Sequence, residues 1–318
     1  CLIIGCSSAG EIATEYQQDG LVAVVFEQDE FRAEGAFIAG VAEYGSSEAK
    51  ETIEGLRSRL ASRAGEDFPN SFAFCLIDGL SVSEERFVAN THAALEGIPL
   101  LGGSAGDNLR FERTTVFCGE RYGSEAAVLL LLRTNLDFEL FHLAHFSPTE
   151  IELVITKADL NTRTVFEIDG GPANEEYAAL LGVSTDALTT TFFSFHPLML
   201  QVGDEWYVRA IQQVNPDGSL TFFCAIEEGV PLCVGSCEDI TVSINKKVKE
   251  FQKKFQDIRL TIGCDCILRR LEMERNGNSD DVLKALQPLN FLGFSTYGEQ
   301  LNSLHVSQTL TGVVLGKR

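Results

Sequence analysis

A short glycine turn with small hydroxyl residues occurs three times in this sequence, each time directly after an apolar run. The copies read GCSSAGE at 5–11, GGSAGDN at 102–108 and GFSTYGE at 293–299. A strand that ends in such a turn offers backbone N–H groups and hydroxyls without bulky side chains in the way, so it can hold a polar ligand. The alternative is that the glycines serve only the positive-φ geometry of strand ends.

Each copy also ends in or near an acidic residue, which disfavours a phosphate ligand and favours a cationic or zwitterionic one. The candidate ligand-binding residues of the turns are Ser7, Ser8, Glu11, Ser104, Asp107, Ser295, Thr296 and Glu299. All three copies lead through a polar stretch into another predicted apolar strand: LVAVVF, AAVLLLL or TGVVLG. We interpret this as one structural unit reused by internal duplication, and we expect the turns at equivalent places in related units.

Two arginines add a candidate partner for a ligand carboxylate. Arg209 lies in a strand pattern between Val208 and Ala210, and Arg269 follows Asp265 and Cys266. A guanidinium can bind a carboxylate through two parallel hydrogen bonds. The alternative is a structural ion pair of either arginine with Asp169 or Asp265.

The five histidines raise the question of haem, which needs a neutral imidazole that reaches iron from an apolar pocket. His145 is the first candidate, followed by His196 and then His142, because all three lie among aromatic or aliphatic residues. The alternative for each is a structural histidine with hydrogen-bonded ring nitrogens. Haem is thus the cofactor of an alternative reading, and the sequence specifies no other.

An enzyme is a further alternative, as a hydrolase or transferase of small molecules. Cys266 or Ser7 would be the nucleophile, or Glu11 and Glu299 would act as acid and base, but no GxSxG elbow and no Cys-His pairing can be read. The close cysteine pairs, at 233 and 237 and at 264 and 266, lack the CxxC spacing of metal or redox sites. We therefore expect a binding protein without a catalytic or metal site.

The elements that position these residues alternate between helix and strand. The apolar periodicity predicts helices over 47–64, 84–96 and 239–256, and a short helix that begins near Pro172. Strands are predicted at 71–79 and 258–264. Hairpins are predicted between TTVFC and AAVLLLL and around NPDGS at 215–219. The fold class is α/β, with an α+β-like character, in which mixed or antiparallel sheets are covered by helices.

Composition narrows the partners and the compartment. The 318 residues carry a formal charge of −21, which repels nucleic acids and anionic membrane surfaces. The longest apolar run, Ala126 to Leu132, is far below the ~20 residues of a membrane span. The odd number of scattered cysteines favours a reduced, cytoplasmic setting. Since Cys1 is not Met, we expect that a natural N-terminal segment precedes it.

An ordered set of motifs, GCSSAGEI, GGSAGD, EIDGGPANEEY, YVRAI, CDCILRR and GFSTYGEQ, resembles the FIST family over essentially the whole chain. The resemblance implies an N-terminal half at 1–150 and a C-terminal half at 151–318. It also implies a sensory domain of signal transduction that binds a small ligand such as an amino acid. One subgroup is similar to haem proteins that sense nitric oxide and regulate a histidine kinase. Gln300 departs from the family pattern, which has an apolar residue there.

We therefore expect a sensory input protein of a bacterial-type pathway that binds a small polar, amino-acid-like metabolite between its two halves. The alternatives are a haem-bound nitric oxide sensor and an interaction scaffold without a ligand. Because no kinase or DNA-binding module is recognisable in the chain, the output is expected to pass through a separate signalling protein such as a histidine kinase. A homodimer is left open.

Overall fold

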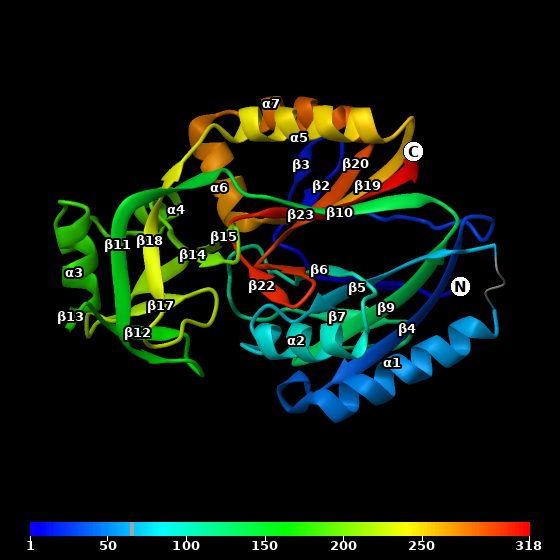
Figure 1. Cartoon of the computed structure of the whole chain (residues 1–318), viewed down its shortest axis with the longest axis horizontal. Helices are drawn as coiled ribbons and strands as arrows, with labels where there is room; N and C mark the ends of the chain where they lie inside the picture. Colours follow the sequence, from blue (N-terminus) through cyan, green and yellow to red (C-terminus); the bar gives the residue numbers. More distant parts are fainter. Residues whose placement is uncertain (64–66) are drawn as a thin grey trace.

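Two six-stranded sheets face each other in the larger part of the molecule, and helices cover their outer faces (Figure 1). The computed structural model of the protein describes residues 1–63 and 67–318. The strand order is β22-β21-β6-β5-β9-β4 in the first sheet and β10-β23-β19-β20-β2-β3 in the second. Phe72 and Leu132 of the first sheet pack against Val313 and Leu315 of the second. The two sheets therefore share one apolar core.

Most of the first sheet comes from one continuous stretch of chain. Its elements are β4 (Phe31–Ala39), η1 (Val41–Glu43), α1 (Ser46–Ala61), β5 (Asn70–Ile77), α2 (Glu84–Ala94), β6 (Leu100–Ser104) and β9 (Ala126–Thr134). The predicted helices at 47–64 and 84–96 and the strand at 71–79 are confirmed; position 64 lies outside the described residues. Leu56 of α1 and Phe87 of α2 pack on the outer face of the sheet.

The second sheet repeats the same succession of elements. Its elements are β10 (Asp137–Leu143), α5 (Ile240–Lys254), β19 (Asp257–Cys266), α6 (Ile267–Asn276), α7 (Ser279–Leu286), η3 (Gln287–Leu289), β20 (Phe291–Thr296) and β23 (Leu310–Lys317). The order β20-β19-β23-β10 matches β6-β5-β9-β4, and each order contains one parallel pair, β19 with β20 and β5 with β6. The predicted duplication, the helix at 239–256 and the strand at 258–264 are thereby confirmed.

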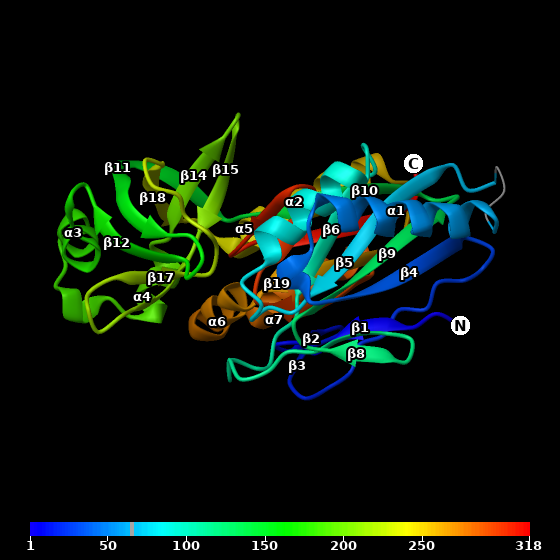
Figure 2. The ribbon, with the colours of Figure 1, turned by 90° about the horizontal axis from the view of Figure 1, so that it is seen from below.

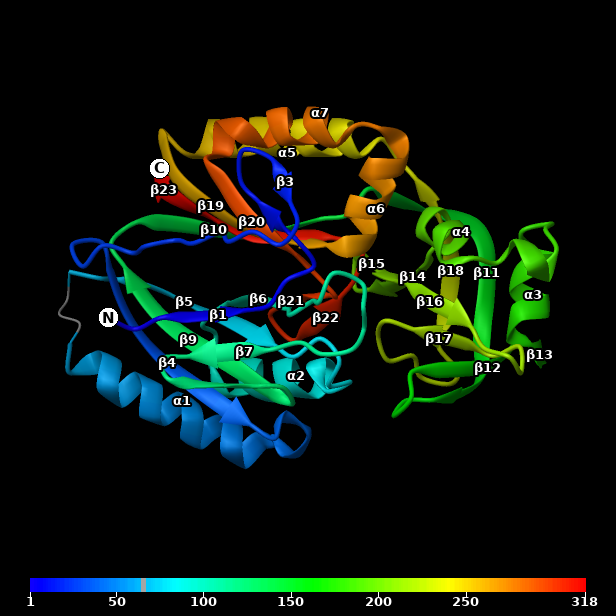
Figure 3. The same cartoon turned by 180° about the vertical axis from the view of Figure 1, so that it is seen from behind.

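Only two of the three glycine turns lie at equivalent places in this repeat, after β6 and after β20. The first follows β1 (Ile4–Cys6), which forms a separate sheet with β7 (Val116–Cys118) and β8 (Arg121–Gly123) (Figure 2). The chain then crosses to the second sheet through β2 (Glu11–Ile12) and β3 (Tyr16–Gln17) (Figure 3). After the third turn, β21 (Glu299–Leu301) and β22 (Leu304–Val306) join the first sheet. Each sheet thus contains two strands that come from the part of the chain that forms the other sheet.

Residues 146–237, here called the inserted unit, interrupt the second repeat between β10 and α5 and lie at one end of the molecule (Figure 1). Their elements are β11 (Phe146–Asp159), β12 (Thr164–Ile168), β13 (Gly171–Pro172), α3 (Ala173–Leu180), η2 (Thr185–Ala187), α4 (Thr190–Phe195), β14 (Leu198–Val202), β15 (Glu205–Arg209), β16 (Ile211–Val214), β17 (Leu220–Phe222) and β18 (Pro231–Cys237). The helix after Pro172 and the hairpin around NPDGS are confirmed. Position 150, the predicted end of the N-terminal half, lies inside β11. The chain crosses to and from the inserted unit at 144–145 and 238–239.

Two strand predictions are wrong. AAVLLLL does not form a hairpin with TTVFC; as β9 it pairs with β4 and β5, while β7 pairs with β1 and β8. Leu129 of β9 faces the helices and Leu130 faces the second sheet, so burial on both faces explains the uninterrupted apolar run. LVAVVF, at 21–26, has no strand partner, and Leu21 and Val25 are 87% and 85% exposed.

No helix among the described residues combines the length and the apolar character needed to cross a membrane. All nine cysteines are free thiols.

Candidate functional site

The three glycine turns, far apart in sequence, meet between the two sheets. We call them turn 1 (5–11), turn 2 (102–108) and turn 3 (293–299). Backbone hydrogen bonds join them pairwise: Ala9 N to Ser295 O (2.9 Å), Ser295 N to Gly10 O (2.7 Å), Ser104 N to Gly298 O (2.8 Å) and Gly106 N to Ser7 O (3.1 Å). Every turn therefore contacts both others, and the repeated motif marks a single place in the fold.

Close backbone approach explains why small residues recur in the motif. A Cβ atom on Gly106 would lie 2.7 Å from the backbone nitrogen of Ala9. Gly10 has a φ of 136°, and a Cβ atom there would lie 1.8 Å from Nη1 of Arg270. A larger residue at either position would push turn 1 away from its neighbours.

Turns 1 and 2 enclose a polar surface hollow of about 230 Å³. It is lined by Ser7, Ser8, Gly10, Glu11, Asp19, Asp107, Asn108 and Arg110. Three carboxylates and one guanidinium make this lining acidic. Four of the predicted ligand residues, Ser7, Ser8, Glu11 and Asp107, are brought together here. The lining residues all come from the first 110 residues, whereas the sequence placed the pocket between the two halves.

Each carboxylate oxygen of Glu11 accepts one hydrogen bond from turn 1 or from the segment that follows it. Its Oε1 accepts a hydrogen bond from Ser8 Oγ (2.6 Å), and its Oε2 accepts one from Gly20 N (2.9 Å). Ser8 Oγ in turn accepts a hydrogen bond from Gly10 N (3.1 Å). Each carboxylate oxygen has two lone pairs, so one fixed bond per oxygen leaves capacity for a ligand donor. Glu11 is thus oriented and still able to bind an amine.

Asp107 is held differently, because its carboxylate accepts four hydrogen bonds. The donors are the Tyr297 hydroxyl and the backbone N–H groups of Phe111 (2.9 Å), Glu112 (2.7 Å) and Arg113 (2.9 Å). Burial opposes ionisation, but these donors outweigh it and lower the pKa of Asp107. Asp107 therefore shapes the loop beside the hollow.

This loop carries backbone strain. Asn108, Leu109 and Phe111 have positive φ values of 62°, 64° and 52°. Non-glycine residues in the left-handed region each cost on the order of 1 kcal/mol, so the four bonds to Asp107 must hold the conformation. Arg110 reaches the hollow from this strained segment. Sequence reasoning missed Arg110, Asp19 and Asn108; reading turn 2 onward to GGSAGDNLR would have included two of them.

The other predicted turn residues lie beneath the hollow and do not reach it. Ser104, Ser295, Thr296 and Glu299 are fully buried. Glu299 accepts hydrogen bonds from Thr296 Oγ1 (2.5 Å) and Thr309 Oγ1 (2.7 Å), yet its burial raises its pKa to about 8. At neutral pH it is therefore mostly protonated.

Gln300, where the chain departs from the family pattern, bridges two turns. Its Nε2 donates to Ser104 Oγ of turn 2 at 2.8 Å. A polar residue there thus supports the meeting of the turns.

Arg269 and His145 belong to a buried polar network away from the hollow. Arg269 Nε donates to Asp265 Oδ1 (2.6 Å), which confirms the ion-pair alternative. Its Nη1 lies 2.9 Å from His145 Nδ1, and His145 Nε2 lies 2.7 Å from Glu272 Oε2. Because a guanidinium only donates, His145 must accept at Nδ1 and donate from Nε2. Both ring nitrogens are occupied, so His145 does not fit a haem iron.

The same tautomer disfavours a metal ion at this network. His145, Cys237 and Glu272 have ligand atoms within 4.8 Å of one another. A metal at Nε2 would require a proton on Nδ1, which would then face the Arg269 guanidinium. In addition, burial and Glu272 raise the pKa of the Cys237 thiol to about 12, so it would be a poor ligand.

Of the other histidines, His196 has the more suitable surroundings for a ligand. It lines a surface hollow of about 320 Å³ with Phe192, Phe195, Arg275 and Asn276. The ring of His142 instead stacks on Tyr207, with 5.6 Å between ring centroids.

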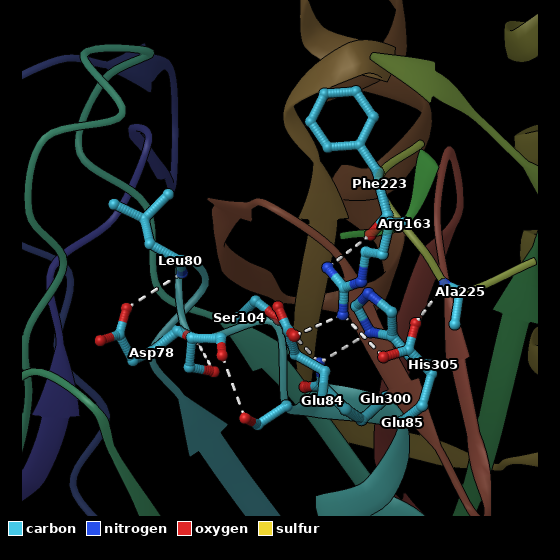
Figure 4. Close-up of polar contacts among 12 residues, drawn as sticks. Asp78, Leu80, Glu84, Glu85, Ser104, Arg163, Phe223, Ala225, Gln300 and His305 are labelled. Atoms are coloured by element: carbon cyan, nitrogen blue, oxygen red, sulfur yellow. Dashed lines mark hydrogen bonds and ion pairs between the residues drawn. The ribbon is translucent and has the colours of Figure 1, made fainter. Parts of the chain in front are cut away.

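Arg209 lies in the seam between the inserted unit and the rest of the chain, where its Nη1 donates weakly to His305 O (3.5 Å). The stronger contact of this seam was not predicted. Arg163 Nη2 donates to Glu84 Oε2 and Glu85 Oε2, both at 2.6 Å, and its Nη1 donates to Phe223 O at 2.9 Å (Figure 4). Glutamates in the first turn of a helix are common, so Glu84 and Glu85 carried no sequence signal for these ion pairs with Arg163.

The candidate nucleophiles are poorly placed for catalysis. Cys266 is buried, and its burial raises the thiol pKa well above the ordinary value. Ser7 Oγ accepts a hydrogen bond from Thr115 N (3.0 Å), and among the described residues no side chain accepts a hydrogen bond from its hydroxyl and could act as its base. Glu299 does not line the hollow where Glu11 lies, so the two do not form an acid and base pair there.

Comparison with known proteins agrees with this architecture. A FIST N domain model matches residues 1–171, and a FIST C domain model matches residues 173–302. An uncharacterized protein of Methanocaldococcus jannaschii is 22% identical over 354 aligned residues, which cover 98% of this chain and 67% of the relative. FIST domains are sensory ligand-binding domains of signal transduction and are not a family of enzymes. This chain, with both domains in the family's order, belongs to the FIST family.

Proposed function

We propose that the protein senses a small zwitterionic metabolite of the amino-acid type, bound in the hollow between turns 1 and 2. The supporting observation is the arrangement of charge in the lining. Glu11 and Asp19 supply carboxylates, and Arg110 supplies the guanidinium. An ammonium group would be attracted to the carboxylates and a carboxylate to Arg110. A ligand with a single charge would pair either with the carboxylates or with Arg110, but not with both.

Binding would add a contact at Arg110 to the strained loop that carries it, and a sensor of this kind acts through its differential affinity for two states. The output would pass to a separate signalling protein such as a histidine kinase. Ligand recognition and output would then reside on different chains.

A thermal-shift screen of the twenty amino acids and simple amines tests this function, followed by calorimetric titration of any hit. Replacing Glu11 by Gln keeps the shape of the side chain and removes its charge. We expect affinity to fall about tenfold or more, the value of one charge-assisted hydrogen bond.

Glu15→Gln is the matched control, because Glu15 lies in the same segment outside the hollow lining. Its affinity should stay at the wild-type value. Either no hit in the screen, or equal affinities of the two variants, would refute this assignment.

Haem at His196 is the second candidate function. Within the described residues, no hydrogen bond to the His196 ring is formed, and burial lowers its pKa, which favours the neutral, ligating form. Phe192 and Phe195 would pack on a porphyrin, and Arg275 would reach a propionate. Bound haem would supply an iron site for a diatomic gas such as nitric oxide.

Its test is the absorption spectrum after haem reconstitution. A stoichiometric Soret band that His196→Ala abolishes and His92→Ala retains would establish the haem site. A spectrum without a band would eliminate this candidate and leave the metabolite sensor.

A further inference from the structure

Helix α6 contacts both turn 1, which lines the hollow, and the two crossings to the inserted unit. On the side of the hollow, Arg270 Nη1 donates to the backbone oxygen of Ala9 in turn 1 at 3.0 Å. Arg270 is 5% exposed, so this bond is shielded from water. The Tyr16 hydroxyl of β3 lies 3.6 Å from the sulfur of Met273, one helical turn further along. Turn 1 and the hairpin after it therefore rest on α6.

The other side of α6 faces the crossings. Glu272 Oε2 lies 2.7 Å from Nε2 of His145 in the first crossing. Its Oε1 lies 3.4 Å from the Cys237 sulfur, where β18 leads into the second crossing. The two crossings also bond to each other, because Glu238 N donates to His145 O at 2.7 Å. One carboxylate thus holds both connections.

Because these contacts are buried, water cannot replace them when they are stretched. Glu272 and His145 have side chains that are 1% and 0% exposed. A shift of α6 that broke their hydrogen bond would leave the Glu272 carboxylate buried without that partner and without water to replace it, which is strongly unfavourable. Displacement of α6 must therefore carry His145 and Cys237 with it or replace their contacts as a set.

We propose that α6 couples turn 1 to the crossings, so that occupation of the hollow changes how the inserted unit is placed. The coupling to ligand rests on the proposed function, whereas the mechanical link through Arg270 and Glu272 does not. Since coupling is reciprocal, disturbing the crossings must also loosen turn 1.

Hydrogen exchange measured by mass spectrometry on the ligand-free protein tests the link directly. Arg270→Gln removes the bond to Ala9. We expect amides in turn 1 and in both crossings to exchange about fivefold faster or more, the effect of about 1 kcal/mol of coupling.

Glu274→Gln is the matched control, because Glu274 is the other partner of Arg270, at 2.8 Å, and does not contact turn 1. It should leave both regions unchanged. Faster exchange confined to turn 1, or no change in either region, would overturn the proposal.

A second variant covers the case in which Arg270→Gln loosens the whole protein, which faster exchange in β9 would reveal. Glu272→Gln alters the crossings without touching turn 1. The proposal requires faster exchange at residues 7–11 in this variant, and unchanged exchange there would refute it. Because neither measurement uses a ligand, a failed metabolite screen and a failed link give different results.

Discussion

Turns 2 and 3 occupy equivalent places in the two repeats, yet their acidic residues are in opposite electrostatic environments. Asp107 receives four hydrogen bonds at the edge of the hollow, and its pKa is lowered. Glu299 is fully buried, and its pKa is raised to about 8. One motif has therefore produced a carboxylate that is charged and a carboxylic acid that is mostly neutral at pH 7.

The two environments differ because the chain takes a different course after each turn. Turn 3 continues as β21, which joins the first sheet between β6 and the edge strand β22. Turn 2 continues as a surface loop to β7. Duplication supplied the local structure, and its surroundings then decided which copy could face a ligand.

The largest expected effect concerns Glu299 and pH. Its pKa is about 8 in the folded protein and 4.5 in its unperturbed state. Between these values the folded state holds a proton that the unfolded state has lost, so the free energy of unfolding falls as pH rises. The slope is at most about 1.4 kcal/mol per pH unit, and the contribution is level above pH 8.

Glu299→Gln removes this dependence, because the amide imitates the protonated acid. Urea unfolding of both proteins from pH 5 to pH 9 measures the effect. The variant should match the wild type at pH 5 to within about 1 kcal/mol and become the more stable protein as pH rises. A constant difference over the whole range would contradict a buried neutral Glu299.

The second prediction concerns the equivalent isosteric substitution in turn 2. Asp107→Asn places an amide group among four donors, so we expect the free energy of unfolding at pH 7 to fall by about 1–3 kcal/mol. Asp19→Asn is the control, because Asp19 lines the same hollow and its side chain accepts no hydrogen bond within the described residues. It should change stability by less than about 0.5 kcal/mol. If Asp107→Asn were neutral in urea unfolding, the two carboxylates would not differ as described.

The smallest expected effect concerns the hydrogen bonds of Ser8 in turn 1, which are weaker supports than those of Asp107 in turn 2. Ser8→Ala removes the donor to Glu11 and the acceptor for Gly10 N, both near the surface. We expect a loss of about 0.5–1.5 kcal/mol in urea unfolding. Ser62→Ala, which removes an exposed bond to Arg59 O, should cost less. An equal effect of the two would mean that Ser8 does not orient Glu11.

Local patterns were sufficient for much of the fold. The apolar periodicity placed α1, α2 and α5, and turn residues placed the hairpin between β16 and β17. These features depend on neighbours along the chain, and their residues carry the information directly. The recurrence of the glycine turn likewise predicted the duplication, because similar sequences form similar local structures.

The sequence alone also determined the family and the chemical character of the candidate site: small residues, hydroxyls and carboxylates at three turns. Only the tertiary structure decided that these turns meet, that Glu11 and Asp107 face the hollow, and that Glu299 is buried. It also paired Arg269 with Asp265 and His145, and placed Arg110 beside Glu11. Burial and the direction of a side chain depend on strands brought from distant parts of the chain, and no local pattern encodes them.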